Sequence, residues 1–149
     1  MKIKRSTLLS FLLIVVSFLL SFILYFSLHF VHRQVFIFEG LDKNRLYVEQ
    51  RFFPNVKNVD RVELYVSDLV LGPIGNRYKN LFAPGTKVVS CFVRGKNLYV
   101  ELSKDALKID KNTTEFEKAI KLFKKNIHRN FFWLSNVHIF IDGVAVGEI

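Results

Sequence analysis

The chain has 149 residues, of which half are hydrophobic, and its 22 basic and 13 acidic side chains give a formal net charge of +9. This length is enough for one domain with its own core, and too short for two once a membrane segment is subtracted. The single cysteine excludes an internal disulfide and a zinc site built from several cysteines.

The N-terminal segment from Ser6 to Leu28 is apolar and uncharged. A helix rises about 1.5 Å per residue, so this segment is long enough to cross a bilayer core of roughly 30 Å. A cleaved signal peptide would have a shorter apolar region followed by small residues, and a lipoprotein start would have a cysteine there, whereas this segment ends in bulky residues. We therefore predict a transmembrane signal anchor over residues 6–30.

The charges around this segment predict its orientation. Three basic residues and the amino terminus precede it, while Arg33 and two histidines expected to be neutral follow it. Because cytoplasmic flanks carry the excess of Lys and Arg, we place residues 1–5 in the cytoplasm and a periplasmic domain over residues 31–149. The expected protein is a single-pass protein of the cell membrane, and a domain outside the cytoplasm is not expected to bind nucleic acid.

The domain begins with a predicted hairpin. Gln34–Glu39 and Arg45–Phe53 are rich in β-branched and aromatic residues, and the residues between them, Gly40–Asn44, favour a turn. Proline cannot donate to a strand ladder, so Pro54 is expected to close the second strand.

The next segment, Asn58–Leu71, fits both strand alternation and one helical face. We prefer a helix, because Asn58 is a suitable N-cap and Gly72-Pro73 a suitable end. The two prolines and two glycines of Pro73–Gly85 then predict a loop that closes on the turn dipeptide Pro84-Gly85.

A second hairpin is predicted from Lys87–Val93 and Asn97–Leu102, because the turn between them contains Gly95, which adopts a positive φ at little cost. Alternation along the second strand places three side chains toward the core: Leu98, Val100 and Leu102.

A second helix follows at Thr114-Glu-Phe-Glu117, which has the spacing of a capping box, and apolar residues then recur at helical spacing as far as Ile127. The last strand is Val137–Ile141, followed by an Asp142-Gly143 turn. The predicted order is β-β-α-β-β-α-β, an α/β (α+β) domain in which two helices pack on a small mixed sheet.

These segments resemble the GerMN domain family, named for a sporulation and germination protein of spore-forming bacteria. The resemblance covers about Val35 to Glu148, and its specificity lies in the series of motifs rather than in any one of them. The match is carried by four segments: Leu69–Pro73, Ala83–Ser90, Gly95–Ser103 and Val137–Gly143. Their structural motif residues are Gly72, Pro73, Pro84, Gly85, Gly95, Asp142 and Gly143. A lysine-rich linker at Lys104–Thr114 departs from the family pattern.

The resemblance implies a ring-building-motif-like fold and an interaction module with no known catalysis, cofactor or metal. We therefore expect a non-enzymatic membrane-anchored protein of the bacterial cell envelope that binds itself or a protein partner. The alternative is a ligand-binding or envelope-remodelling enzyme with a polar cleft between the loop at Pro73–Gly85 and the second helix. Three residues are the only nearby candidates for its polar groups: Asp68, Arg77 and Lys79.

The candidate interaction surface is the basic face of the second helix with the aromatic residues beyond it. It contains Lys118, Lys121, Lys124, Lys125, Arg129 and Trp133. Such a face is ordinarily only solvated, but clustered cations also attract acidic proteins or anionic lipid headgroups. The ordinary role of Phe131-Phe-Trp133 is to close the core, which we favour, and if partly exposed these residues would form an interaction hot spot.

The remaining chemical groups favour structural roles. Cys91 lies in the middle of a predicted strand and is expected to pack in the core, since free cysteine is among the most buried residue types. The four histidines lack the spacing and companion ligands of a metal site: His29, His32, His128 and His138.

Overall fold

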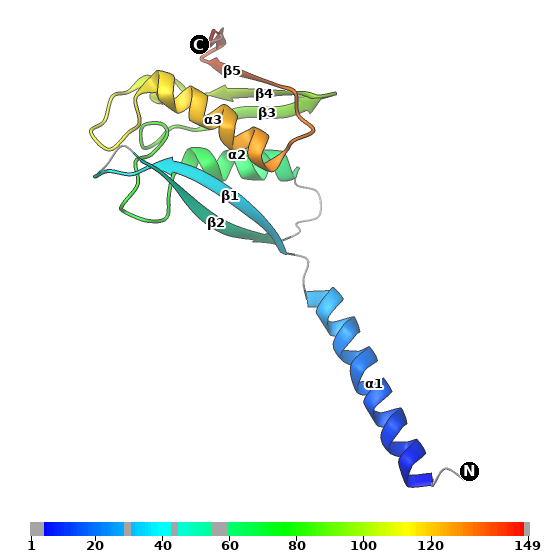
Figure 1. Cartoon of the computed structure of the whole chain (residues 1–149). Coiled ribbons are helices and arrows are strands. Elements are labelled where there is room, and N and C mark those ends of the chain that lie inside the picture. Colours follow the sequence, from blue (N-terminus) through cyan, green and yellow to red (C-terminus); the bar gives the residue numbers. More distant parts are fainter. Residues whose placement is uncertain (1–4, 29–30, 43–44, 55–59, 148–149) are drawn as a thin grey trace. The chain divides into compact units, whose positions relative to one another are not determined.

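The computed structural model describes residues 5–28, 31–42, 45–54 and 60–147, and it divides into two units (Figure 1). One unit comprises Met1–His32 and Phe52–Asn55, and the other comprises Arg33–Arg51 and Val56–Ile149. The first is dominated by one helix, and the second contains the helices and strands of a folded domain.

The helix α1 (Arg5–Leu28) is apolar around its whole circumference. Within it, Ser6–Tyr25 is a 20-residue stretch with a mean hydropathy of 2.7 and no buried residue. A helix that is apolar on every side belongs in a hydrophobic surrounding. By length and composition this helix can cross a membrane, although a signal sequence near an N-terminus has the same properties. Residues 29–30 of the predicted anchor lie outside the described residues.

The predicted first hairpin is confirmed by β1 (Val31–Glu39) and β2 (Leu46–Pro54), which form a two-stranded sheet. At the turn the Gly40 N–H donates to the Arg45 carbonyl at 2.8 Å. Residues 43–44 of the predicted turn lie outside the described residues.

The ambiguous segment forms the helix α2 (Arg61–Leu71). Its N-cap is Asp60, whose carboxylate accepts from the Val62 N–H at 2.8 Å. The prediction that Asn58 is the cap is therefore wrong, and Asn58 itself lies outside the described residues. A carboxylate gives the same hydrogen bond as an asparagine and also interacts favourably with the helix dipole. The helix ends as predicted at Gly72, where φ is +102° and a Cβ would clash with the Asn80 Oδ1.

The strands β3 (Val88–Arg94), β4 (Asn97–Leu102), β5 (Asn136–Ile141) and β6 (Val144–Ala145) form a four-stranded sheet in that order. The pairs β3–β4 and β5–β6 are antiparallel and β4–β5 is parallel, which makes this a mixed sheet. The predicted fold class is confirmed. The strands divide between two sheets and do not form the single predicted sheet, because side chains of α3 bond to the backbone groups of β1 on the side away from β2, as described below. The predicted core positions Leu98, Val100 and Leu102 are fully buried.

The lysine-rich linker contains a short 3-10 turn, η1 (Lys104–Leu107), and then leads into α3 (Phe116–Asn130). The predicted capping box is wrong, because the N-cap residue is Glu115 and its side chain makes no capping hydrogen bond. The backbone of Thr114 instead runs beside Asn80, to whose carbonyl its N–H donates at 2.9 Å. The hydroxyl of Thr114 is buried and has no hydrogen-bond partner in the described part of the chain.

The core lies where α2 and α3 pack against the four-stranded sheet and against β1 (Figure 1). The buried side of α3 carries apolar residues at the predicted spacing, including Ala119, Ile120, Phe123 and Ile127. On α2, Tyr65 is fully buried and stacks on Phe36 of β1 with ring centroids 4.5 Å apart. This packing fixes the face of α3 that points away from the core.

Candidate interaction surface

Two asparagines on α3 fix this helix against β1. The amide of Asn126 accepts from the Ile37 N–H at 2.7 Å and donates to the Ile37 carbonyl at 2.9 Å. The amide of Asn130 does the same with Val35, at 2.9 and 2.7 Å. Residues four apart on a helix lie on one face, so the pair bonds to alternate residues of the strand as a neighbouring strand would.

Tyr65 completes this polar cluster. Its hydroxyl donates to the Val35 carbonyl at 2.8 Å and accepts from the amide of Asn130 at 2.8 Å. Burial raises the pKa of Tyr65 far above its usual value against the opposing charge of Arg51, so the hydroxyl stays protonated. The cluster therefore holds β1, α2 and α3 together through neutral groups.

The basic residues of α3 divide into paired and unpaired groups. Lys118 bonds to Glu39 at 2.9 Å, and Lys79 bonds to the same carboxylate at 3.3 Å. The Glu39 side chain is only 3% exposed. Burial alone would raise its pKa, but hydrogen bonds from the two lysines hold the pKa of Glu39 below its usual value. Lys118 thus contributes to the fold.

The other basic residues of the predicted surface carry no ion pair within the part of the chain that the structure describes: Lys121, Lys124, Lys125 and Arg129. Lys124 lines a hollow of about 190 Å³ beside β5 together with His128. Lys125 and Arg129 line a different hollow of about 490 Å³ beside β1, together with Arg33. The structure therefore divides the predicted basic face into a side next to β5 and a side next to β1.

The three aromatic residues after α3 have different surroundings. Phe131 is buried and meets Tyr65 edge to face, with centroids 5.4 Å apart. Phe132 is 90% exposed and Trp133 is 43% exposed. The sequence favoured a core position for all three residues, and only Phe131 has one. Phe132 and Trp133 are exposed, as the hot-spot alternative requires.

The residues of the family motifs occupy turns. All four glycines of this set have a positive φ: Gly72, Gly85, Gly95 and Gly143. Asp142 also has a positive φ, of 52°, in the turn between β5 and β6. Pro73 and Pro84 lie beside two of these glycines, in the loop between α2 and β3. These positions shape the backbone.

The three polar residues predicted to line a cleft contact different parts of the chain. Asp68 bonds to the guanidinium of Arg51, a buried residue that also donates to the Gly72 carbonyl at 2.7 Å. Lys79 bonds to Glu39, as described above. Arg77 is exposed and lines a hollow of about 230 Å³ with Tyr78.

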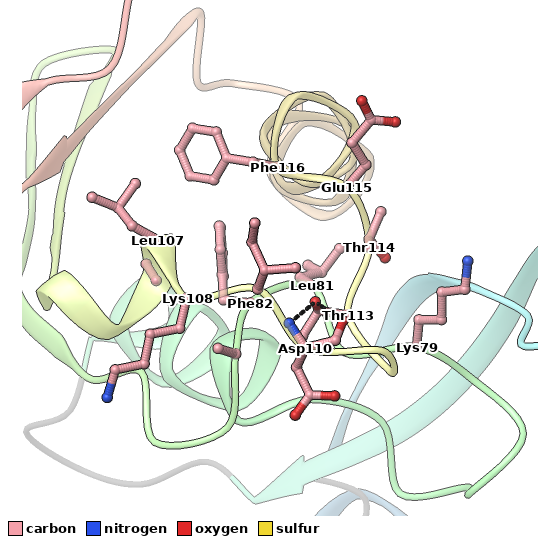
Figure 2. Close-up of a pocket in the computed structure, with 13 residues that line it drawn as sticks. Lys79, Leu81, Phe82, Leu107, Lys108, Asp110, Thr113, Thr114, Glu115 and Phe116 are labelled. Carbon is pink, nitrogen blue, oxygen red and sulfur yellow. Dashed lines mark hydrogen bonds between the residues drawn. The ribbon is translucent and has the colours of Figure 1, made fainter.

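A hollow of about 440 Å³ does lie between the loop and the start of α3 (Figure 2). Apolar side chains form much of its wall, including Leu81, Phe82, Leu107 and Phe116 (Figure 2). Its exposed carboxylates, Asp110 and Glu115, form no ion pair in the described part of the chain. The hollow offers apolar contact area and a few solvated polar groups.

Cys91 is half-buried on β3. Burial, with smaller contributions from Glu63 and Asp60, raises the pKa of its thiol to about 12, so the unreactive protonated form dominates at neutral pH. Among the described residues, no group of three or more histidine, cysteine, aspartate or glutamate side chains could hold a metal ion. His138 stacks on Tyr99, with centroids 4.9 Å apart, and His29 lies outside the described residues.

The fold defines the class of protein. It matches the tandem GerMN domains of the sporulation protein GerM from Bacillus subtilis with a TM-score of 0.62 at 12% identity, over 79% of this chain and 42% of that one. It matches the first GerMN domain of GerM with a TM-score of 0.54 at 18% identity, over 76% of this chain and 86% of that one. The fold is that of a GerMN domain.

The chain belongs to the family described as "Germane: Sporulation and spore germination", whose profile matches residues 25–146. The resemblance inferred from the motifs is thereby confirmed. A curated relative, an uncharacterized lipoprotein of Treponema pallidum (strain Nichols), is 30% identical over 80 residues, which are 54% of this chain and 60% of the relative. The chain therefore spans less than two thirds of that relative and of the tandem GerM structure.

Proposed function

We propose that this chain is a single-pass membrane-anchored protein of the bacterial cell envelope whose GerMN domain binds an acidic protein partner and performs no catalysis. The apolar helix α1 and the similarity to a lipoprotein support membrane attachment. The orientation, with the domain outside the cytoplasm, follows from the basic residues that precede the helix.

One observation carries the binding proposal: Lys121 and Lys124 form no ion pair in the described part of the chain, although Lys118 on the same helix does. Complementary charges across an interface mainly increase the association rate and the specificity. An acidic surface on a partner would satisfy these two lysines where the chain itself does not.

The test is crosslinking in cells with the full-length chain, followed by identification of the captured proteins. The double charge reversal Lys121→Glu/Lys124→Glu should reduce capture of the partner strongly. It should leave the fold intact, since Lys121 is exposed, Lys124 is half-buried without an ion pair in the described part of the chain, and surface substitutions usually change stability by less than about 0.5 kcal/mol. The matched control reverses two exposed lysines elsewhere, Lys96 and Lys111, and should capture normally. Equal capture by both folded variants would contradict the proposed surface.

Membrane attachment and orientation have their own test. A reporter that is active only outside the cytoplasm, fused after Ile149, should be active and should remain in the membrane fraction after washing at high salt. An inactive reporter would mean that the orientation is the reverse of the one proposed. Release of a shortened soluble chain would mean that the segment is a cleaved signal and not an anchor.

A further inference from the structure

The start of β1 and the end of α3 lie at the same end of the folded domain. Val35 bonds to Asn130 near the end of the helix, and Glu39 bonds to Lys118 near its beginning, so strand and helix run in opposite directions (Figure 1). Arg33 is the first residue of the folded unit, so the chain enters that unit at this end.

Unpaired cations gather at this end. The hollow of about 490 Å³ is lined by Arg33, Lys125 and Arg129, and no carboxylate lines it. None of the three forms an ion pair within the described ranges. A further residue of the hollow, His128, bonds through its Nδ1 to the Leu134 carbonyl at 3.1 Å.

Exposed aromatic side chains follow these cations in the chain, after the end of α3. Phe132 and Trp133 follow directly after the end of α3, and the buried Phe131 fixes their position. Tryptophan and long basic side chains are typical of the boundary between lipid and water, where one end of the side chain is apolar and the other is solvated. We define the tether surface as Arg33, Lys125, Arg129, Phe132 and Trp133.

The length of the chain limits how far this surface can be from the bilayer. Arg33 is eight residues after Tyr25, the last residue of the apolar span. An extended chain covers at most about 3.6 Å per residue, so Arg33 stays within about 29 Å of the end of that span. This inference rests on the membrane anchoring proposed above.

We infer that the tether surface binds the anionic headgroups of the leaflet next to the domain. Each basic side chain near an anionic bilayer contributes to binding, by about fivefold in affinity. An acidic protein would also match the charges, but the nearness of the bilayer and the exposed aromatic pair favour lipid. Lys121 and Lys124 stay available for a protein partner, because they are not part of this surface.

Trp133 is the only tryptophan of the chain and reports directly on this contact. The full-length protein is reconstituted into vesicles of phosphatidylcholine alone or with about one third phosphatidylglycerol, each containing lipid brominated near the headgroups. We expect stronger quenching and a blue shift of Trp133 fluorescence in the anionic vesicles, both reversed by high salt because surface attraction is screened.

The test variant is Arg33→Gln/Lys125→Gln/Arg129→Gln, and the matched control removes three exposed charges outside both proposed surfaces, by Lys87→Gln/Lys108→Gln/Lys111→Gln. The test variant should lose the anionic-lipid quenching, and the control should retain most of it. Equal quenching in neutral and anionic vesicles, or equal loss in both variants, would overturn the inference. Flotation of the protein with neutral vesicles at high salt reports the anchor separately, so failure of the anchor is distinguished from failure of the tether surface.

Discussion

The two ends of α3 use the same residue types for different purposes. Near the beginning of the helix, Lys118 is held by the buried Glu39. Near the end, Lys125 and Arg129 have no such partner in the described part of the chain, and Asn130 makes the contact with β1 instead. A lysine thus contributes to the fold when a carboxylate from a distant part of the sequence lies beside it, and it makes no ion pair in the described part of the chain when only amides do.

The largest expected effect concerns the amides. Asn126→Ala should leave the N–H and the carbonyl of Ile37 unpaired in a fully buried place. Because each unsatisfied buried polar group costs about 1–3 kcal/mol, we expect a loss of about 3–5 kcal/mol of unfolding free energy. Urea unfolding of the full-length chain in detergent measures this loss.

The control is Asn136→Ala, which removes an exposed hydrogen bond of 2.7 Å to Asn97. It should cost less than about 1 kcal/mol, because water replaces the lost partner. If Asn126→Ala is no more damaging than this control, the amides of α3 do not stabilise β1 as described.

The paired cations give the next effect. Glu39→Gln should lower the unfolding free energy by about 2 kcal/mol at neutral pH, because two lysines lose a buried anion. The folded pKa of Glu39 is below its usual value of 4.5, so its contribution is present above that value and disappears as the pH falls through the lower folded pKa. The difference in stability between the native chain and the variant should therefore shrink below about pH 4.

Unfolding curves from pH 3 to pH 7 check this dependence. A difference that stays constant over the whole range would mean that Glu39 acts through its shape rather than through its charge.

The smallest effect compares the two ends directly by the same substitution. Lys118→Gln should cost about 1 kcal/mol, because Glu39 keeps only Lys79 as a partner. Lys125→Gln should change the unfolding free energy by less than about 0.5 kcal/mol, because this exposed lysine has no ion pair in the described part of the chain. Thermal unfolding of both variants side by side measures the difference, and equal costs would remove the distinction between the ends.

Local patterns predicted most of the elements. Strand-forming residues around turn residues identified the two hairpins, alternation identified the core positions of β4, and helical spacing identified α3. One cap error, Asn58 in place of Asp60, is a shift of two residues, and the other occurred where a distant residue decides the local structure. Thr114 has the spacing of a cap, but its backbone N–H donates to the carbonyl of the distant residue Asn80.

The candidate surface was predicted less well, for the same reason. No residue near Lys118 in the sequence indicates its ion pair with Glu39, so the paired lysine could not be distinguished from the unpaired ones. The one available signal was missed: Asn126 and Asn130 interrupt the apolar side of a helix, four residues apart, where a polar side chain needs a specific partner.

The asparagines of α3 also bear on how the chain avoids aggregation. Val35–Phe38 is an uncharged run with high β-propensity, the kind of segment that pairs with other chains when its backbone groups are open. In the folded domain the amides occupy those groups on the side away from β2, so another strand cannot add there. During synthesis β1 is made long before α3. A chain whose second half has not yet been made therefore presents β1 with open backbone groups, and we expect its tendency to aggregate to be greatest at that stage.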